Sequence, residues 1–332
     1  MSNKYTEKYR LYRGEELSGF QLLLKIVMPV LSEIKYWVLF FSIYGTVISL
    51  VYSRWQLPLL IPEDSLAFNT GLIVFNLGLS ALLGFRINTS HQRFWEARTL
   101  WGQLVNVSRN LARDICITVQ IESTKNRKEQ ENILLLIAAF AIAMKLHLRA
   151  EPVNDELASL MSKTQYTKLK YSVKHPPLRI AHWIGNYLQS QYEHNRLNIY
   201  QLTDLHWLVN TMVDVLGGCE RILKTPQPII YSLMLHKLVI VYCLVLPLII
   251  VNVVHGFTSL IITFASIVLL GIEQMGSQLE QPFANNNPNT LPLDLICKTI
   301  LFNIEELIES IEYTCNLEEI FRESVNNYLD RN

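Results

Sequence analysis

Charged side chains are scarce in this sequence. Of its 332 residues, 17% are Asp, Glu, Lys or Arg, while 50% are hydrophobic and the mean hydropathy is +0.20. A soluble domain usually carries about 25% charged residues. Lys plus Arg and Asp plus Glu number 29 each, so there is no net charge to attract a polyanion such as nucleic acid. This composition indicates a membrane protein with no nucleic-acid partner.

The sequence also lacks the patterns of metal, redox and catalytic sites. It has five cysteines but no CxxC pair, and an odd number of separated cysteines does not predict a disulfide framework. There is no Gly-rich phosphate loop, no GxSxG and no HExxH. We therefore expect no catalytic residue, no metal and no cofactor, and reduced, structural thiols at Cys116, Cys219, Cys243, Cys297 and Cys315.

Long apolar runs are what the sequence does contain. About 20 apolar residues cross the hydrocarbon core of a bilayer as a helix. One further run, Ile133–Met144, is too short by that measure and predicts a buried or interfacial helix. His236 and Lys237 lie within the third long run, where they require protein, water or the membrane interface beside them. We predict four membrane spans, at about residues 34–53, 66–86, 229–251 and 256–275.

The basic residues predict the orientation of these spans. The first 33 residues hold five Lys or Arg, and more Arg residues follow the second span. The link between the first two spans has only Arg54, and the link between the last two has none. Because basic residues favour the cytoplasmic side, we expect both termini there. The membrane is left open between a bacterial plasma membrane and a thylakoid-type membrane.

The segments outside the spans carry a helical pattern. Apolar residues recur at helical spacing in Leu104–Val119 and again in Leu202–Leu216, and no alternating strand pattern stands out. Residues 87–226 and 276–332 are therefore predicted to be helical and cytoplasmic. The fold class is all-α, and we expect residues 1–332 to form a single domain in which spans and cytoplasmic helices share a core.

Three blocks of the sequence adjoin the predicted spans. The first is GFRINTSHQRFWEARTLWGQLVNVSRNLARD, which begins at Gly84. The second is CERILKTPQPIIYS, Cys219–Ser232, and the third is LEQPFANNNPNTLPLDLICKTI, Leu279–Ile300. In this order the three blocks resemble the bestrophin family, specifically its bacterial and plastid branch. With the four spans, the resemblance covers most of residues 18–320. It implies an ion channel, a homopentamer in the lipid bilayer whose five second spans surround one central pore.

The resemblance also implies where this pore is narrow. An apolar neck within the membrane corresponds by position to Leu77, Ala81 and Phe85. A second, cytoplasmic constriction corresponds to Thr203, with Leu202 as the alternative if the alignment shifts by one residue.

The neck positions are physically consistent with such a role. Residues 77, 81 and 85 are spaced i, i+4, i+8 and share one helix face. A ring of apolar side chains can gate a pore by excluding water. The alternative is that these side chains face lipid or other helices, which is the usual place of apolar residues in a span. The same stripe extends to further candidate pore or vestibule residues, which are Thr70, Val74, Arg86 and Asn88.

The third block differs from that of the calcium-gated animal members. Where they have a run of acidic residues, this chain has Ala284 followed by three Asn, Pro288 and Asn289, with no carboxylate before Asp294. Calcium requires six to eight oxygen ligands with carboxylates among them. We therefore expect no calcium clasp of the animal type.

The function we predict is passive conduction of small monovalent anions, chloride first, with bicarbonate and nitrate as further candidates. An apolar neck without acidic side chains does not favour cations, and helix N-termini facing a cavity favour anions. A sodium- or potassium-selective channel of the same fold is the main alternative. A transporter, a membrane-bound enzyme and a scaffold without transport are the others; the sequence has no internal repeat that would favour a transporter.

Overall fold

The computed structural model describes residues 19–55, 66–120, 124–285 and 289–310. These residues form helices and contain no strand, which confirms the all-α prediction. They divide into two compact units, each made of segments that are separate in the sequence. The apolar unit comprises the described residues within 10–96 and 224–290. The α4 unit comprises the described residues within 97–223 and from 291 onward. Most of the basic N-terminal segment and residues 286–288 lie outside the described residues.

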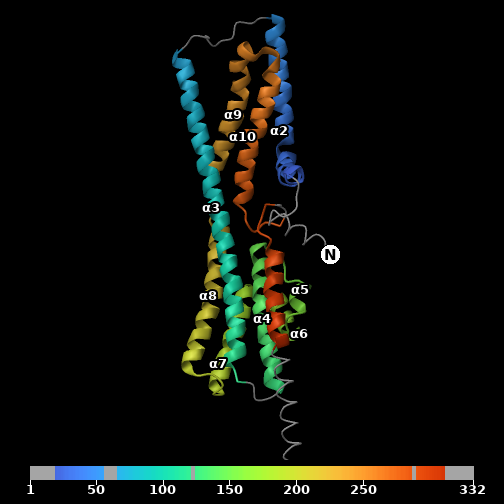
Figure 1. The fold of residues 1–332 in the computed structure, drawn as a ribbon, viewed down its shortest axis with the longest axis vertical. Coiled ribbons are helices and arrows are strands. Elements are labelled where there is room, and N and C mark those ends of the chain that lie inside the picture. Colours follow the sequence, from blue (N-terminus) through green and yellow to red (C-terminus); the bar gives the residue numbers. More distant parts are fainter. Residues whose placement is uncertain (1–18, 56–65, 121–123, 286–288, 311–332) are drawn as a thin grey trace, which may run out of the picture. The chain divides into compact units, whose positions relative to one another are not determined.

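The apolar unit consists of four helices (Figure 1). They are α2 (Gly19–Trp55), the first part of α3 (Leu66–Thr118), α9 (Ile229–Val254) and α10 (Thr258–Leu279), with a short 3₁₀ turn, His255–Phe257, between the last two. Each helix lies in a stretch long and apolar enough to cross a membrane. The four predicted spans are thus confirmed as helices.

Buried side chains from all four helices form the core of the apolar unit. Phe41 of α2, Leu83 of α3, Val239 of α9 and Ile262 of α10 belong to one cluster. The crossing of α2 with α10 is close because Gly45 has no side chain. A Cβ at that position would lie 3.2 Å from the Cα of Ser259 and would collide with Ile262.

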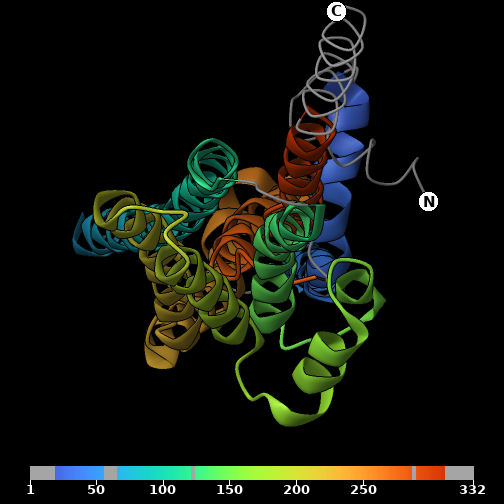
Figure 2. The same ribbon diagram turned by 90° about the horizontal axis from the view of Figure 1, so that it is seen from below.

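The described residues of the α4 unit form six helices and the second part of α3. Figure 2 shows the ribbon from below. Two of the six helices, α5 (Asp155–Ala158) and α6 (Lys163–Ser172), are short. The last helix begins at residue 293 and is described as far as residue 310. The longer helices of this unit are α4 (Thr124–Leu148), α7 (Pro176–Glu193) and α8 (Ile199–Lys224).

Helix α4 lies at the centre of its unit and packs along α7. From Leu134 to Met144 every residue but one is buried. An apolar helix that is covered all round belongs in a core. Of the two predictions for Ile133–Met144, a buried or an interfacial helix, the burial of these residues supports the buried helix.

Candidate pore helix and buried charge clusters

Helix α3 packs against the rest of the apolar unit through one narrow stripe. Leu79, Leu83, Arg86 and Ser90 are buried, and their spacing of four, three and four residues places them on one face. The hydroxyl of Tyr231 in α9 donates a hydrogen bond to the carbonyl of residue 82 on the same side, at 3.1 Å. This face fixes the rotation of α3 within the unit.

The three predicted neck residues lie on the opposite face. Residues 77, 81 and 85 fall within about 80° of one another around the helix, at about 100° per residue, and about 180° from the buried stripe. Leu77 is 67% exposed and Phe85 is 66% exposed, and Ala81 is exposed as well. Within one copy of the chain, an apolar stripe therefore has no protein cover.

The candidate pore residues that extend this stripe in both directions are exposed too, with one exception. Thr70, Val74 and Asn88 are all exposed on the same side of α3. Arg86 is different: its side chain is 1% exposed and lies on the packed face. We therefore leave Arg86 out of the candidate lining.

Arg86 instead belongs to a buried charge cluster with α10. Its Nη2 lies 3.8 Å from an oxygen of Glu273 and 3.9 Å from an oxygen of Glu280. Gly276 leaves the space for this side chain, since a Cβ there would lie 3.2 Å from Nε of Arg86. Glu280 also accepts a hydrogen bond from the backbone N–H of Gln227, at 3.0 Å. The cluster thus ties α3 to α10 and to the segment that precedes α9.

His236 of α9 contacts the same cluster, and the segment before α9 contacts α3. Nδ1 of His236 lies 3.3 Å from Glu273, and its ring meets Trp37 edge-on with centroids 6.1 Å apart. The guanidinium of Arg93 donates to the carbonyl of Thr225. A histidine that the sequence places within a span is therefore accommodated by partners in its own chain.

The two candidates for the second constriction differ in exposure. Thr203 is exposed on α8, and its hydroxyl donates to the carbonyl of Ile199 at 2.8 Å. Leu202 is buried in the core of the α4 unit. Of the two, only Thr203 has a side chain that is accessible in one copy of the chain.

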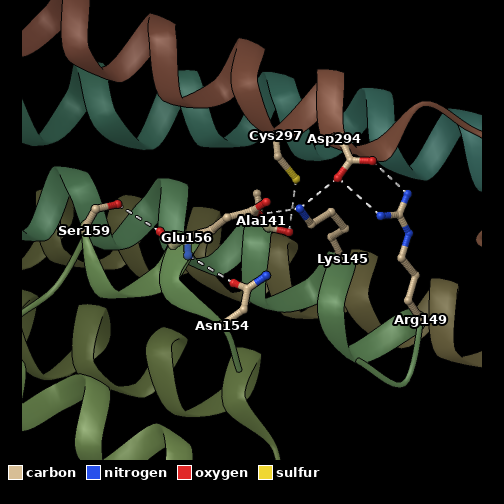
Figure 3. Close-up of polar contacts among 8 residues, drawn as sticks. All are labelled: Ala141, Lys145, Arg149, Asn154, Glu156, Ser159, Asp294 and Cys297. Atoms are coloured by element: carbon tan, nitrogen blue, oxygen red, sulfur yellow. Dashed lines mark hydrogen bonds and ion pairs between the residues drawn. The ribbon is translucent and has the colours of Figure 1, made fainter. Parts of the chain in front are cut away.

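A second charge cluster lies inside the α4 unit (Figure 3). The Lys145 ammonium is 3% exposed and donates to Glu156 at 2.6 Å and to Asp294 at 2.9 Å. Arg149, just after the end of α4, binds the other oxygen of Asp294 at 3.1 Å. Asn154 caps α5 by accepting a hydrogen bond from the N–H of Glu156. Three separate segments are thereby held together by charge.

The contacts of this cluster favour the charged forms of Lys145 and Asp294. Burial lowers the pKa of Lys145, but its hydrogen bonds with Glu156 and Asp294 outweigh burial, so the pKa lies above the ordinary lysine value. Burial raises the pKa of Asp294, but hydrogen bonds from Lys145 and Arg149 outweigh it, so the pKa lies below the ordinary aspartate value. Lys145 and Asp294 therefore stay charged throughout the physiological pH range.

This arrangement also concerns the segment from Ala284 to Asp294, for which we expected no calcium clasp of the animal type. Asp294 is its first carboxylate, and Lys145 and Arg149 already neutralise it. The amide of Asn289 donates to Gln278 at 2.7 Å. The side chains of Asp294 and Asn289 are therefore both bound by other side chains of this chain.

Comparison with known proteins identifies the family. The sequence model of the family of bacterial and fungal bestrophin proteins matches residues 12–306 of this chain. The chain belongs to the bestrophin family. Among curated relatives, a voltage-dependent anion channel-forming protein of Nostoc sp. is 43% identical over 288 residues, which are 87% of this chain and 91% of that protein. A protein of the same name from Synechocystis sp. is 46% identical over 237 residues, 71% of this chain and 76% of that protein.

Solved bestrophin structures agree with the fold. A crystal structure of a point variant of a bacterial bestrophin homologue from Klebsiella pneumoniae matches with a TM-score of 0.75 and 28% identity. The match covers 84% of this chain and 98% of that chain. With its apolar helices, this bestrophin chain is an integral membrane protein.

Proposed function

We propose that this bestrophin conducts small monovalent anions through a pore lined by α3 from several copies of the chain. The observation that carries the proposal is the exposed stripe of Leu77, Ala81 and Phe85, opposite the face that packs. A helix with one packed face and one uncovered apolar face needs lipid or further copies of itself around it. Five copies would bring five such stripes to one axis.

The charge pattern of α3 supports anions over cations. From residue 66 to residue 95 the helix carries no Asp or Glu, so the neck has no acidic ring to attract cations. An apolar neck of this kind selects through the cost of dehydration, and weakly hydrated anions such as nitrate meet a lower barrier. The relatives in Nostoc and Synechocystis are named as anion channel-forming proteins, which agrees with this assignment.

The assembly we propose is a homopentamer built from a single bestrophin domain, residues 1–332, with both termini in the cytoplasm. Thr70 and Val74 then line the pore outside the neck, Asn88 lines it inside, and Thr203 forms the second constriction. Because Asp294 is neutralised from within the chain, we further propose that opening does not require calcium. Chelating calcium should leave the current unchanged.

The first test is the reversal potential of the purified protein in a planar bilayer under asymmetric KCl. We expect a value near the chloride equilibrium potential. A value near the potassium equilibrium potential would keep a pore but overturn anion selectivity in favour of a cation channel. A protein that is monomeric and passes no current would contradict the channel itself.

The second test addresses the neck. Phe85→Ala should widen it and raise the single-channel conductance. Phe75→Ala is the matched control, because Phe75 is on the same helix but its ring stacks on Tyr242 of α9, with centroids 6.0 Å apart. An unchanged current in Phe85→Ala would remove Phe85 from the proposed pore.

A further inference from the structure

Two histidines and a glutamate converge inside the α4 unit, away from the cluster of Lys145. His147 comes from the last turn of α4, His175 immediately precedes α7, and Glu220 lies in α8. Nε2 of His147 lies 2.9 Å from Oε1 of Glu220, and Nε2 of His175 lies 2.7 Å from the same oxygen. The two imidazole rings are 4.4 Å apart between centroids.

These three groups are a donor set for a transition metal. Two imidazole nitrogens and one carboxylate oxygen suit zinc and its neighbours in the first transition row. Zinc binds such donors at about 2.0–2.2 Å, which in a tetrahedron separates them by about 3.3–3.5 Å. The observed separations of 2.9 and 2.7 Å are about 0.4–0.8 Å shorter, so side-chain rotations that move the donors apart by this amount would admit the ion.

We propose that His147, His175 and Glu220 form a binding site for a divalent transition metal of the zinc class. The three side chains are 25%, 35% and 17% exposed, so an ion can enter and a water molecule can fill the fourth position. The sequence analysis predicted no metal because these residues are far apart in the chain and form no motif. The fold brings them together.

Metal binding replaces the two direct contacts between the imidazoles and Glu220, and it also changes one further hydrogen bond. Nδ1 of His175 accepts a bond from the N–H of Leu178 at 3.4 Å, which caps α7. When Nε2 binds a metal, the proton of a neutral imidazole moves to Nδ1, and this bond is lost. The loss is small because the bond is long. Pro176 and Pro177, the first two residues of the helix, have no N–H that would need a partner.

The site would add metal bonds between three segments that already meet through the contacts of the two imidazoles with Glu220. A metal bound there joins the end of α4, the start of α7 and the C-terminal part of α8. Because it would bind the folded protein and not the unfolded chain, it raises thermal stability by mass action. The site does not depend on conduction, so its test is independent of the proposed pore.

The experiment measures zinc binding to the purified full-length protein by equilibrium dialysis, together with thermal unfolding. We expect one zinc per chain and a higher Tm with zinc, reversed by EDTA, and no such effect of magnesium, which prefers oxygen ligands. Glu220→Gln keeps the shape of the side chain and an acceptor for the imidazoles, yet should weaken zinc binding at least tenfold. His147→Ala should do the same.

The matched control is His182→Ala. His182 is exposed on α7, where it contacts Asn186 and neither of the other histidines, so its loss should leave zinc affinity unchanged. The proposal would be overturned if the wild-type protein did not bind one zinc per chain. Uptake that is equal in wild type and a folded Glu220→Gln variant would also overturn it, because zinc would then be bound elsewhere.

Discussion

Two apolar helices of this protein have opposite surroundings. The most apolar stretch of α4 is 78% buried inside its own unit, while the corresponding stretch of α3 is 17% buried. Both helices are long enough to cross a membrane and both pass the same test of hydropathy. Hydropathy therefore identifies the helices whose side chains must avoid water. Burial shows which of these helices are not covered by other parts of the same chain.

The difference follows from what each helix packs against. Helix α4 is covered by helices of its own chain, so its apolar residues are satisfied without lipid. Helix α3 offers one stripe, including Leu79 and Leu83, to its own chain and leaves Leu77 and Phe85 uncovered. An exposed apolar surface of this kind marks an interaction with lipid or protein. In the proposed function, lipid and further copies of α3 both cover the exposed apolar surface of α3.

A pair of identical substitutions tests this difference directly. Phe140 in α4 is fully buried, so Phe140→Ala should destabilise the protein by about 3–5 kcal/mol. Phe85→Ala removes the same atoms from an exposed position and should cost less than about 1 kcal/mol. Thermal or denaturant unfolding in detergent measures both effects.

The pair also has a clear failing result. If the two variants lost similar stability, Phe85 would be packed as tightly as Phe140 in the assembled protein. The proposed pore face would then be a contact between helices, and the neck would have to lie elsewhere.

Much of this arrangement could be predicted from local sequence, because it depends on local spacing. The length of Ile133–Met144 indicated a buried or interfacial helix, and the i, i+4, i+8 spacing placed Leu77, Ala81 and Phe85 on one face. The burial of Arg86 could not be predicted in this way, since it depends on Glu273 and Glu280 in a distant helix.

The clusters of the α4 unit illustrate the same limit. Lys145 and Asp294 are 149 residues apart in the chain, and only the fold makes them partners. A lysine that closes an apolar run was the one available signal, because a buried ammonium needs a carboxylate. The convergence of two histidines on Glu220 had no comparable signal in the sequence.

Lys145→Met should produce the next largest effect and sharpens the description of α4 as a core helix. Removing the ammonium leaves the partly exposed Asp294 with Arg149 alone, and removing one partner of such a hydrogen-bonded pair costs about 1–3 kcal/mol. Lys168→Met is the control, because Lys168 is exposed on α6. Equal unfolding midpoints for the two variants would show that the cluster adds no stability.

The pH dependence of stability follows from the same cluster. The lowered pKa of Asp294 gives stability that is present above its unfolded pKa and is lost as the pH falls through the lower, folded value. The raised pKa of Lys145 gives stability that is lost only as the pH rises through its folded value, above about 10.4. Between pH 5 and 9 the contribution of this cluster to the stability of the wild type should therefore be present and independent of pH, in contrast to its loss below about pH 4.

Two glycines extend the comparison to packing within the apolar unit. Gly45→Ala forces a Cβ against Ile262 and Ser259, and such overpacking costs about 1–3 kcal/mol. Gly78 in α3 has no heavy atom within 4 Å of an added Cβ, so Gly78→Ala should not destabilise one copy of the chain. A change in oligomeric state in Gly78→Ala, measured by light scattering, would indicate that a second copy packs there.

The smallest expected effect concerns Thr203 and is seen in current rather than in stability. Thr203→Leu replaces an exposed hydroxyl with an apolar side chain and, if the residue forms the second constriction, should favour nitrate over chloride. Thr167→Leu is matched to it, because Thr167 is exposed on α6 and its hydroxyl also donates to the carbonyl four residues earlier, at 2.8 Å in both cases. Both variants should unfold like the wild type, since neither side chain is buried. A shift of the reversal potential under nitrate against chloride in Thr203→Leu alone would assign the constriction to α8. The same shift in both variants, or in neither, would exclude Thr203, and because Leu202 is buried the constriction would then lie on another helix.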